Sequence, residues 1–328
     1  MNYLGSKIRL SKFIYNTVSE VVDTKLSELI FCDLFAGTGT IGKLFQRKVK
    51  NIISNDREYY SYVLNRAHFK GNINIENDLI NQLNEVKGNR GFIFNEYSEN
   101  GKAGRLYFSE INGQKIDAIR LKIEEWRKAE TICEEQYYYL LASLLTSVDK
   151  IANTAAMYGA YLKQLKTSAK RILSLHPISI LGNHQQKNEV FNQDSNNLIK
   201  KISGDILYLD PPYNRREYAA NYHLLNTIAL YDRTFIPQGK TGIRPYKTSK
   251  YCLKNKAAEA LDHLVGNANF EYIFLSYNNE GIIPEKSIKE IMIQYGNYKR
   301  VSMLYPRFNS HKGQTFKKTK EYIHILTK

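Results

Sequence analysis

Apolar runs and helical periodicity alternate along the two outer parts of the chain. Short β-prone runs end in polar residues and are followed by segments with apolar residues at helical spacing. The runs lie at residues 29–35, 52–57, 178–181, 189–194, 206–209, 270–279 and 321–326. Such alternation predicts an α/β fold, in which buried parallel strands are covered by helices on both faces.

The middle of the chain departs from this alternation. Residues 88–113 are rich in Gly and Asn, with short β-prone pieces at 92–94 and 106–108. Helical patterns follow at 114–130 and 135–173, and the second has a long apolar stripe. We therefore expect a discontinuous main domain of residues 1–80 and 186–328, with an inserted, partly helical domain at 81–185.

The chain is strongly basic, with a formal net charge of +15 and 25 Tyr among its 328 residues. Residues 186–328 hold 22 basic and 13 acidic residues, so they supply nine of the fifteen charges. A basic, aromatic-rich protein suggests a nucleic-acid partner. A solvated basic surface would give the same composition, so charge alone does not decide between them.

Basic residues also gather in clusters that suit phosphate contacts. Two acid-free runs hold Arg233, Lys240, Arg244, Lys247, Lys250, Lys254 and Lys256, and then Lys299, Arg300, Arg307, Lys312, Lys317, Lys318 and Lys320. Arg215 and Arg216 lie a few residues after the apolar run at 206–209, and Lys163, Lys166 and Lys170 share one face of a predicted helix. The last three are candidates for DNA contact, although a solvated lysine face is the more common origin of such spacing.

Cysteine and histidine exclude some classes of protein. The three cysteines are far apart and odd in number, and neither they nor the seven histidines have the spacing of metal ligands. We expect no metal, and a reducing, cytoplasmic setting. The N-terminal residues lack the apolar core of a signal peptide, and no apolar run approaches membrane-spanning length.

The run at 206–209 ends in Asp210-Pro211-Pro212-Tyr213. Because proline cannot continue a sheet ladder, the chain must turn there, at the carboxyl end of the strand. Ligands bind at this edge of open α/β sheets. The two prolines fix two φ angles, so Asp210 and the backbone carbonyls can accept hydrogen bonds from a planar amino group while Tyr213 stacks on its ring. The alternative is an ordinary turn with an exposed Tyr.

A glycine-rich turn follows the first strand. The segment reads Asp33-Leu34-Phe35-Ala36-Gly37-Thr38-Gly39, and a helix is predicted directly after it. Glycines allow close backbone approach to a ligand at a helix start. Gly-x-Gly also occurs in dinucleotide folds, but the absence of Gly-Lys-[Ser/Thr] excludes a phosphate-binding P-loop.

Three further polar side chains are placed to bind a nucleoside. Asp56 ends the second strand, near the distance at which an acid binds ribose hydroxyls, although it could simply cap the next helix. Asp194 ends another strand and could accept a hydrogen bond from an adenine amino group. Tyr3 and Lys7 flank a Gly-Ser turn before the first helix, and Lys7 could reach a ligand carboxylate.

Together these motifs resemble the Dam-like (alpha, or D12) class of DNA adenine-N6 methyltransferases. The matching segments, in the same order, are Tyr3-Leu4-Gly5-Ser6-Lys7, the 33–39 glycine loop, Asn55-Asp56 and Asp210-Pro211-Pro212-Tyr213. The continuation at 214–227 is more similar to restriction-associated members than to housekeeping Dam. The resemblance implies a Rossmann-like methyltransferase fold, a final antiparallel strand at the sheet edge, and a target-recognition role for residues 81–185.

The resemblance also implies a function. S-adenosylmethionine would lie near Tyr3, Lys7 and the glycine loop, including Asp33 and Phe35, with Asp56 on its ribose and Asp194 on its adenine. The substrate would be an adenine flipped out of duplex DNA, stacked on Tyr213, with its amino group held by Asp210 and the Pro211 carbonyl. We expect a monomeric modification enzyme, with a cognate restriction endonuclease as a partner, and a loop at 233–256 that binds DNA phosphates.

Other readings of the motifs stay open at this stage. An RNA adenine-N6 methyltransferase shares the Pro-Pro-Tyr chemistry, but its motif usually begins with Asn. A protein-glutamine methyltransferase would not need the basic clusters, and a catalytically silent DNA-binding protein would need neither the glycine turn nor Asp210. The absence of a Pro-Cys nucleophile motif argues against cytosine-C5 methylation.

Overall fold

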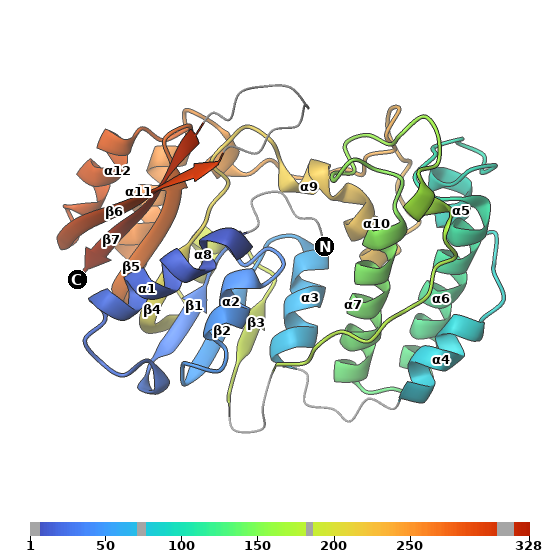
Figure 1. Ribbon diagram of the computed structural model, residues 1–328, viewed down its shortest axis with the longest axis horizontal. Helices are drawn as coiled ribbons and strands as arrows, with labels where there is room; N and C mark the ends of the chain where they lie inside the picture. Colours follow the sequence, from blue (N-terminus) through green and yellow to red (C-terminus); the bar gives the residue numbers. More distant parts are fainter. Residues whose placement is uncertain (1–6, 71–76, 182–185, 307–317) are drawn as a thin grey trace. The chain divides into compact units, whose positions relative to one another are not determined.

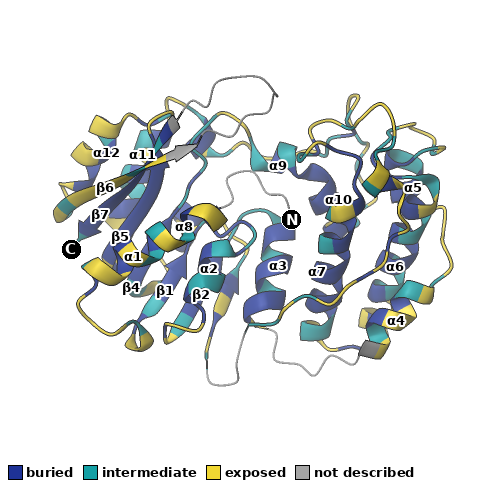
Figure 2. Cartoon of the chain, in the orientation of Figure 1, coloured by how far each residue is buried: buried dark blue, intermediate teal, exposed yellow. Residues whose placement is uncertain are grey.

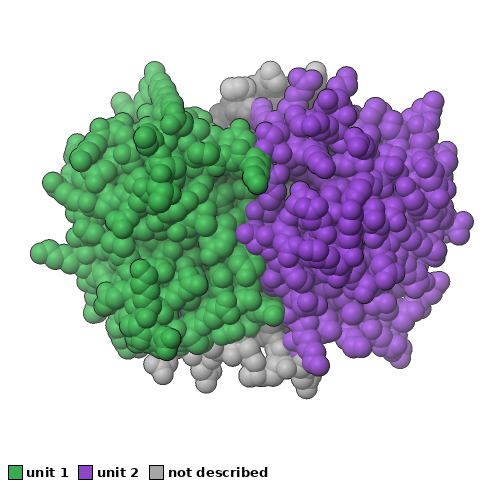
Figure 3. Space-filling view, turned by 180° about the vertical axis from the view of Figure 1, so that it is seen from behind, with its two compact units in different colours: residues 1–6, 58–185, 218–247 green, residues 7–57, 186–217, 248–328 purple. Residues whose placement is uncertain are grey.

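The computed structural model describes residues 7–70, 77–181, 186–306 and 318–328 (Figure 1). The chain divides into two compact units. We call residues 7–57, 186–217 and 248–328 the sheet unit, and residues 1–6, 58–185 and 218–247 the helical unit (Figure 3). Residues 81–185, predicted as a target-recognition insertion, fall wholly within the helical unit. That unit also takes in residues on either side of the insertion, including 218–247.

The sheet unit is built on seven strands in the order β3-β2-β1-β4-β5-β7-β6. The strands are β1 (Ile30–Asp33), β2 (Asn51–Asn55), β3 (Glu189–Phe191), β4 (Ser203–Leu209), β5 (Asn269–Asn278), β6 (Asn297–Pro306) and β7 (Lys318–Thr327). β1 to β5 pair in parallel, and β7 pairs antiparallel with both β5 and β6. The first five strands have the doubly wound order, so the predicted Rossmann-like fold is confirmed.

Helices cover both faces of this sheet (Figure 1). On one face, α8 (Ser195–Leu198), α11 (Ala257–Asn267) and α12 (Glu285–Met292) pack against Leu207, Leu209 and Leu275. On the other lie η1 (Lys7–Leu10), α1 (Ser11–Val21) and α2 (Thr40–Phe45), where Phe31 of β1 stacks on Phe45 at 4.1 Å between ring centroids. The central strands are therefore buried on both sides, as their continuous apolar sequences predict (Figure 2).

The helical unit has its own hydrophobic core. Its helices are α3 (Tyr59–Phe69), α4 (Asn77–Glu85), α5 (Phe92–Tyr97), α6 (Glu110–Lys128), α7 (Glu134–Ile151), α9 (Tyr218–Asn221) and α10 (His223–Leu230). α3 and α7 pack along each other, and the apolar stripe predicted on α7 is buried in this core. Three short 3-10 turns complete the elements of the two units, at Leu26–Glu28, Thr167–Lys170 and Lys250–Cys252.

The second long helix is shorter than its pattern predicts. α7 ends at Ile151, and the backbone of Ala152 is extended. Directly after it, the buried Asn153 donates side-chain hydrogen bonds to the carbonyls of Leu106 and Leu162. An Asn side chain that bonds neighbouring backbone in this way competes with the helix. The prediction that Lys163, Lys166 and Lys170 share a helical face is therefore wrong, and only Lys170 lies in a helical turn, of 3-10 type.

Other predictions of local structure also need correction. Residues 92–94 form the start of helix α5 rather than a strand, because the carboxylate of Asp117 accepts hydrogen bonds from the backbone N–H groups of Ile93 and Phe94. Residues 178–181 form no strand. The last strand, β7, is antiparallel as expected, but it lies inside the sheet, and the unpredicted strand β6 forms the edge.

Candidate active site

Asp210 follows the last residue of β4, where the chain leaves the sheet. The Nζ atom of Lys7, from η1, lies 3.1 Å from its Oδ1 atom, and both side chains are largely buried. Burial raises the pKa of Asp210, while the ammonium of Lys7 opposes that rise. Burial also disfavours the charged Lys7, but the charges of Asp210, Tyr208, Tyr213 and Glu321 together outweigh it, and the pKa of Lys7 is raised. The pair is therefore an ionised lysine bound to a carboxylate at the ligand-binding edge.

Tyr213 lies beside this pair. The Lys7 ammonium is 5.5 Å from the centroid of the Tyr213 ring, and the ring of Tyr277 from β5 meets Tyr213 edge-on at 6.1 Å. The Tyr213 carbonyl accepts a hydrogen bond from the N–H of Ile282 at 2.9 Å. These contacts fix the turn that the two prolines begin. The half-buried Tyr213 ring is thus held in place next to the Asp210 carboxylate.

The glycine turn lies at the end of the neighbouring strand β1. Gly37 and Gly39 have φ angles of 51° and 72°, in the region that favours glycine. The Gly37 N–H donates to Asp56 Oδ2 at 2.7 Å, and the Gly42 N–H donates to Asp33 Oδ2 at 3.1 Å. The acids of β1 and β2 are therefore both tied to the turn, as expected for side chains at adjacent strand ends.

Asp33 is fully buried. Burial raises the pKa of its carboxyl to about 8, against the hydrogen bond from Gly42, and the charges of Asp210 and Asp56 add to the rise. Among the described residues its Oδ1 atom has no hydrogen-bond partner. Three carboxyl groups thus gather at this edge of the sheet, an environment that favours a cationic ligand.

Asp194 and Phe35 lie at the margins of the site. The exposed Asp194 accepts hydrogen bonds from the backbone N–H groups of Asn196 and Asn197 and so caps α8. An open depression of about 420 Å³ adjoins it, lined by Gln193, Asp194, Asn197, Lys200 and Lys201. The half-buried Phe35 packs edge-on against Tyr251 at 5.2 Å. Tyr3 lies outside the described residues.

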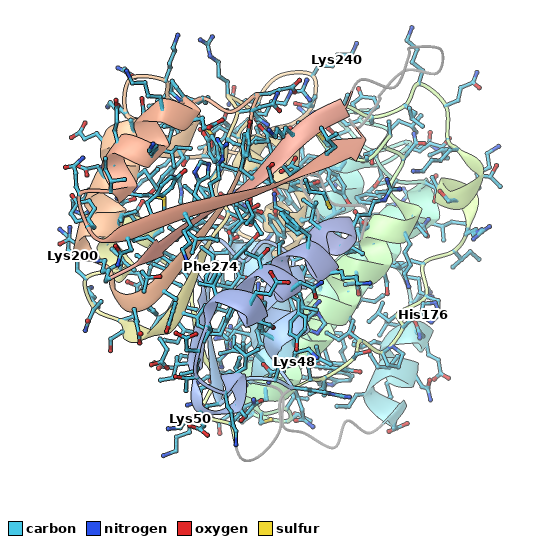
Figure 4. The ribbon with its side chains drawn as sticks, turned by 60° about the vertical axis from the view of Figure 1, so that its left-hand side comes forward. Lys48, Lys50, His176, Lys200, Lys240 and Phe274 are labelled. Atoms are coloured by element: carbon cyan, nitrogen blue, oxygen red, sulfur yellow. The ribbon has the colours of Figure 1, made fainter. Side chains whose placement is uncertain are left out.

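The candidate DNA-binding residues differ in their surroundings. Exposed side chains are those of Lys163, Lys170, Arg215, Arg216, Lys247, Lys250 and Lys254, and Lys240 of the same basic stretch also reaches the surface (Figure 4). Arg244, in contrast, forms two hydrogen bonds with the carboxylate of Asp232. Lys166 is half-buried and donates to the carbonyl of Thr154 at 2.6 Å. Lys166 therefore has a structural partner.

The spacing of motifs did not indicate two polar residues near this site. Asn278 ends β5 and Glu321 pairs with it on β7, and both are buried. Charge interactions link Glu321 to Lys7 and Asp210. An acid inside an apolar strand, Glu321 before Tyr322-Ile323, was the available signal, but nothing in the sequence joined it to Asp210 across more than a hundred residues.

Comparison with known proteins agrees with this geometry. The model of the family described as D12 class N6 adenine-specific DNA methyltransferase matches residues 3–291. The chain is a D12-class adenine-specific DNA methyltransferase. This membership confirms the predicted enzyme class and the predicted N6-adenine chemistry, and it favours DNA over the RNA and protein substrates considered above.

Individual relatives match along most of this methyltransferase. It is 49% identical to "Type II methyltransferase M.NlaIII" of Neisseria lactamica, over 100% of this chain and 99% of that protein. It is 38% identical to "Type II methyltransferase M.FokI" of Planomicrobium okeanokoites, over 100% of this chain but 53% of that longer protein. It is 34% identical to "Type II methyltransferase M.CviAII" of Paramecium bursaria Chlorella virus 1, over 99% and 98%.

The described residues contain neither a membrane-spanning helix nor a cluster of metal ligands. In the described part of the methyltransferase, no helix is long and apolar enough to cross a membrane. Within the same residues, no group of three or more His, Cys, Asp or Glu side chains is arranged to hold a metal ion.

Proposed function

We propose that this methyltransferase transfers a methyl group from S-adenosylmethionine to N6 of an adenine flipped out of duplex DNA, as the modification enzyme of a restriction-modification system. The observation that carries this proposal is the Lys7–Asp210 ion pair, with its 3.1 Å separation, beside the Tyr213 ring at the end of β4. It places a carboxylate acceptor next to an aromatic surface, which is what a planar base with an amino group requires.

The residues at the ends of β1 and β2 fit the methyl donor. When bound, S-adenosylmethionine supplies an electrophilic methyl group on a positively charged sulfonium. Asp56 and Asp210 provide a negative environment for such a cation. A cation beside the buried Asp33, whose pKa is raised to about 8, would favour the ionised form of that carboxyl, and its Oδ1 atom has no hydrogen-bond partner among the described residues. Gly37 and Gly39 would admit the ligand close to the backbone. We assign Asp56 to the ribose, Asp194 to the adenine ring, and Tyr3, Lys7 and Phe35 to the same ligand.

Asp210 and the carbonyl of Pro211 would accept the two hydrogens of the adenine amino group. Holding both hydrogens leaves the nitrogen lone pair available for methyl transfer and stabilises the positive charge that develops on nitrogen. Lys7 would keep Asp210 ionised despite its burial, since the pKa of that carboxyl would otherwise rise further. Catalysis then rests on positioning and electrostatics rather than on a covalent enzyme intermediate.

Tyr213 would hold the extruded base. An adenine cannot react inside the duplex, and flipping it out costs a few kcal/mol. Stacking on an aromatic side chain contributes about 1–3 kcal/mol per base, which offsets much of that cost. The ring is already fixed by Tyr277 and by the Tyr213 carbonyl bond to Ile282, so little side-chain entropy is lost on stacking.

DNA phosphates would bind the exposed basic side chains. Arg215 and Arg216 follow the catalytic turn directly, and Lys247, Lys250 and Lys254 lie in the basic stretch at 233–256. Residues 81–185 would contribute target recognition, with the exposed Lys163 and Lys170 as DNA contacts; Lys166, predicted with them, already has the Thr154 carbonyl as a partner. A modification role is supported by the names of the relatives, which are Type II methyltransferases. A cognate nuclease that acts on the same site would be its partner.

One assay tests the proposal. Labelled methyl transfer from S-adenosylmethionine is measured with duplex DNA, RNA and protein as acceptors, and the product base is identified as N6-methyladenine. We expect transfer to duplex DNA by the intact protein and transfer about 10³-fold slower by Asp210→Ala. Sequencing of methylated DNA from a methylation-free host that expresses the gene would then give the recognition site. The absence of transfer to DNA would refute the proposed function.

A further inference from the structure

Glu321 shares one face of the sheet with the catalytic carboxylate. Tyr208 and Phe274 are partners in the parallel β4–β5 ladder, and Asn278 and Glu321 are partners in the antiparallel β5–β7 ladder. Side chains of paired residues point to the same face, and so do side chains two residues apart along a strand. Asp210 lies two residues after Tyr208, and Asn278 lies four residues after Phe274. The register thus brings Asp210, Asn278 and Glu321 to the same face and the same end of the sheet.

Glu321 is a buried acid that its own strand does not explain. Its side chain is only 8% exposed, and its Oε2 atom has no hydrogen-bond partner among the described residues. Burying a carboxylate without full pairing is costly, so such groups are rare where they have no role. Burial raises the pKa of Glu321 and the charge of Asp210 adds to the rise, while the charge of Lys7 and a hydrogen bond with Asn278 oppose it.

Lys7 therefore faces two acids, one on each side of β5. Asp210 binds its ammonium directly at 3.1 Å, and Glu321 attracts it through space. Both acids also act on the half-buried Tyr213, whose ring lies 5.5 Å from the same ammonium. With one carboxylate alone, the lysine ammonium could form its closest ion pair with both oxygens of that carboxylate. The second carboxylate opposes this and limits where the ammonium can lie.

We propose that Glu321 is a positioning residue for the methyltransferase reaction: its carboxylate, at the Asn278 end of β7, holds the Lys7 ammonium so that Asp210 stays ionised with one oxygen available to the substrate amino group. The inference rests on the proposed function and extends it by one residue. Glu321 acts through Lys7 and does not contact the reacting atoms.

Glu321→Gln and Glu321→Asp separate charge from packing. Glutamine keeps the size of the side chain and removes its charge, whereas aspartate keeps the charge and shortens the chain. We expect Glu321→Gln to lower kcat about tenfold or more, because small misplacements near a reacting centre have effects of this order. KM for each substrate should change less than twofold, and Glu321→Asp should retain more activity. Glu290→Gln, which neutralises an exposed acid on α12 of the same unit, is the matched control and should behave as wild type.

A double-mutant cycle tests whether Glu321 acts through Lys7. In a Lys7→Met background, Glu321→Gln should reduce kcat by less than twofold, since the group that it positions is gone. Melting temperatures show whether each variant folds. Higher activity in the Gln than in the Asp variant, or additive effects of the Lys7 and Glu321 changes, would overturn the inference. Failure of the wild-type protein to methylate DNA would instead refute the proposed function itself.

Discussion

Buried charges are used differently in the two units. In the helical unit, Asp117 accepts backbone hydrogen bonds from Ile93 and Phe94 and a further one from the hydroxyl of Tyr231. In the sheet unit, Asp33 and Glu321 each have an oxygen without a hydrogen-bond partner among the described residues. A buried charge that is fully satisfied by its own fold is structural. One with unused hydrogen-bonding capacity at a strand end is better explained by a role in the active site.

The largest expected effect comes from Asp210. Replacing it by alanine should reduce kcat for DNA methylation by about 10³-fold, because a preorganised electrostatic contact at the reacting group is lost. The melting temperature should fall as well, because the substitution leaves the buried ammonium of Lys7 without its carboxylate partner. Single-turnover kinetics and thermal unfolding of the same sample check both parts. A loss of stability with an unchanged kcat per folded molecule would instead place Asp210 with Asp117 as a structural acid.

Tyr213 should have the next largest effect. Tyr213→Ala should lower kcat/KM for duplex DNA by about tenfold to a hundredfold, which corresponds to 1–3 kcal/mol of base stacking. Tyr213→Phe keeps the ring and should stay near wild type. Fluorescence of 2-aminopurine at the target position would report base flipping directly. Equal losses in the Ala and Phe variants would mean that the hydroxyl, not the ring, matters.

The basic stretch should control salt dependence. Changing Lys247, Lys250 and Lys254 together to glutamine should reduce the slope of log K against log salt by about 2.7, if each contacts one phosphate. A triple change of Lys50, Lys286 and Lys289, which are exposed in the sheet unit, removes the same charge. Binding isotherms at several salt concentrations compare the two variants. Identical slopes in the two triple variants would show that residues 233–256 do not bind DNA phosphates.

Asp117 should affect stability and not catalysis. Asp117→Asn leaves a buried amide facing donors that the carboxylate accepted, which should lower the free energy of unfolding by about 1–3 kcal/mol. Turnover per folded molecule should not change. Denaturant titration and a kcat value corrected for the folded fraction measure the two effects. A tenfold fall in corrected kcat would contradict a purely structural role for this acid.

The smallest expected effect is a shift in pH dependence. Burial raises the pKa of Asp210 and Lys7 opposes this, so removing Lys7 leaves the carboxyl protonated up to a higher pH. The acidic limb of kcat against pH in Lys7→Ala should therefore move to higher pH. A kcat profile from acidic to mildly basic pH measures this shift. If the acidic limb of Lys7→Ala stays at the same pH as in the wild type, a group other than Asp210 is responsible for it.

The sequence predicted the sheet unit better than the helical unit for a physical reason. The motifs at Asp33, Asp56 and Asp210 end parallel strands, and parallel strands bring their carboxyl ends to one edge whatever lies between them. Residues 92–94 have β-prone side chains, yet they form a helix because Asp117, more than twenty residues away, satisfies their N–H groups. Lys166 looked like a surface charge and is held by the Thr154 carbonyl. Such contacts have no local signal.

Glu321 shows the same limit within the site itself. Its place beside Lys7 depends on β7 pairing with β5, and that pairing depends on a register of strands that apolar periodicity does not reveal. The pattern did indicate the strand at 321–326. It missed the edge strand β6, which pairs with β7 and leaves the side chain of Leu304 exposed.

The position of β7 also has a consequence for the order of folding. β7 lies between β5 and β6, although both precede it in the sequence. Until residues 318–327 are made, β6 has no strand to join and β5 presents an open, apolar edge. During synthesis this half of the sheet therefore closes late, through contacts that are distant in sequence and slow to form. A chain that stops before residue 318 would carry a recognisable catalytic motif and an aggregation-prone strand edge, but no finished site.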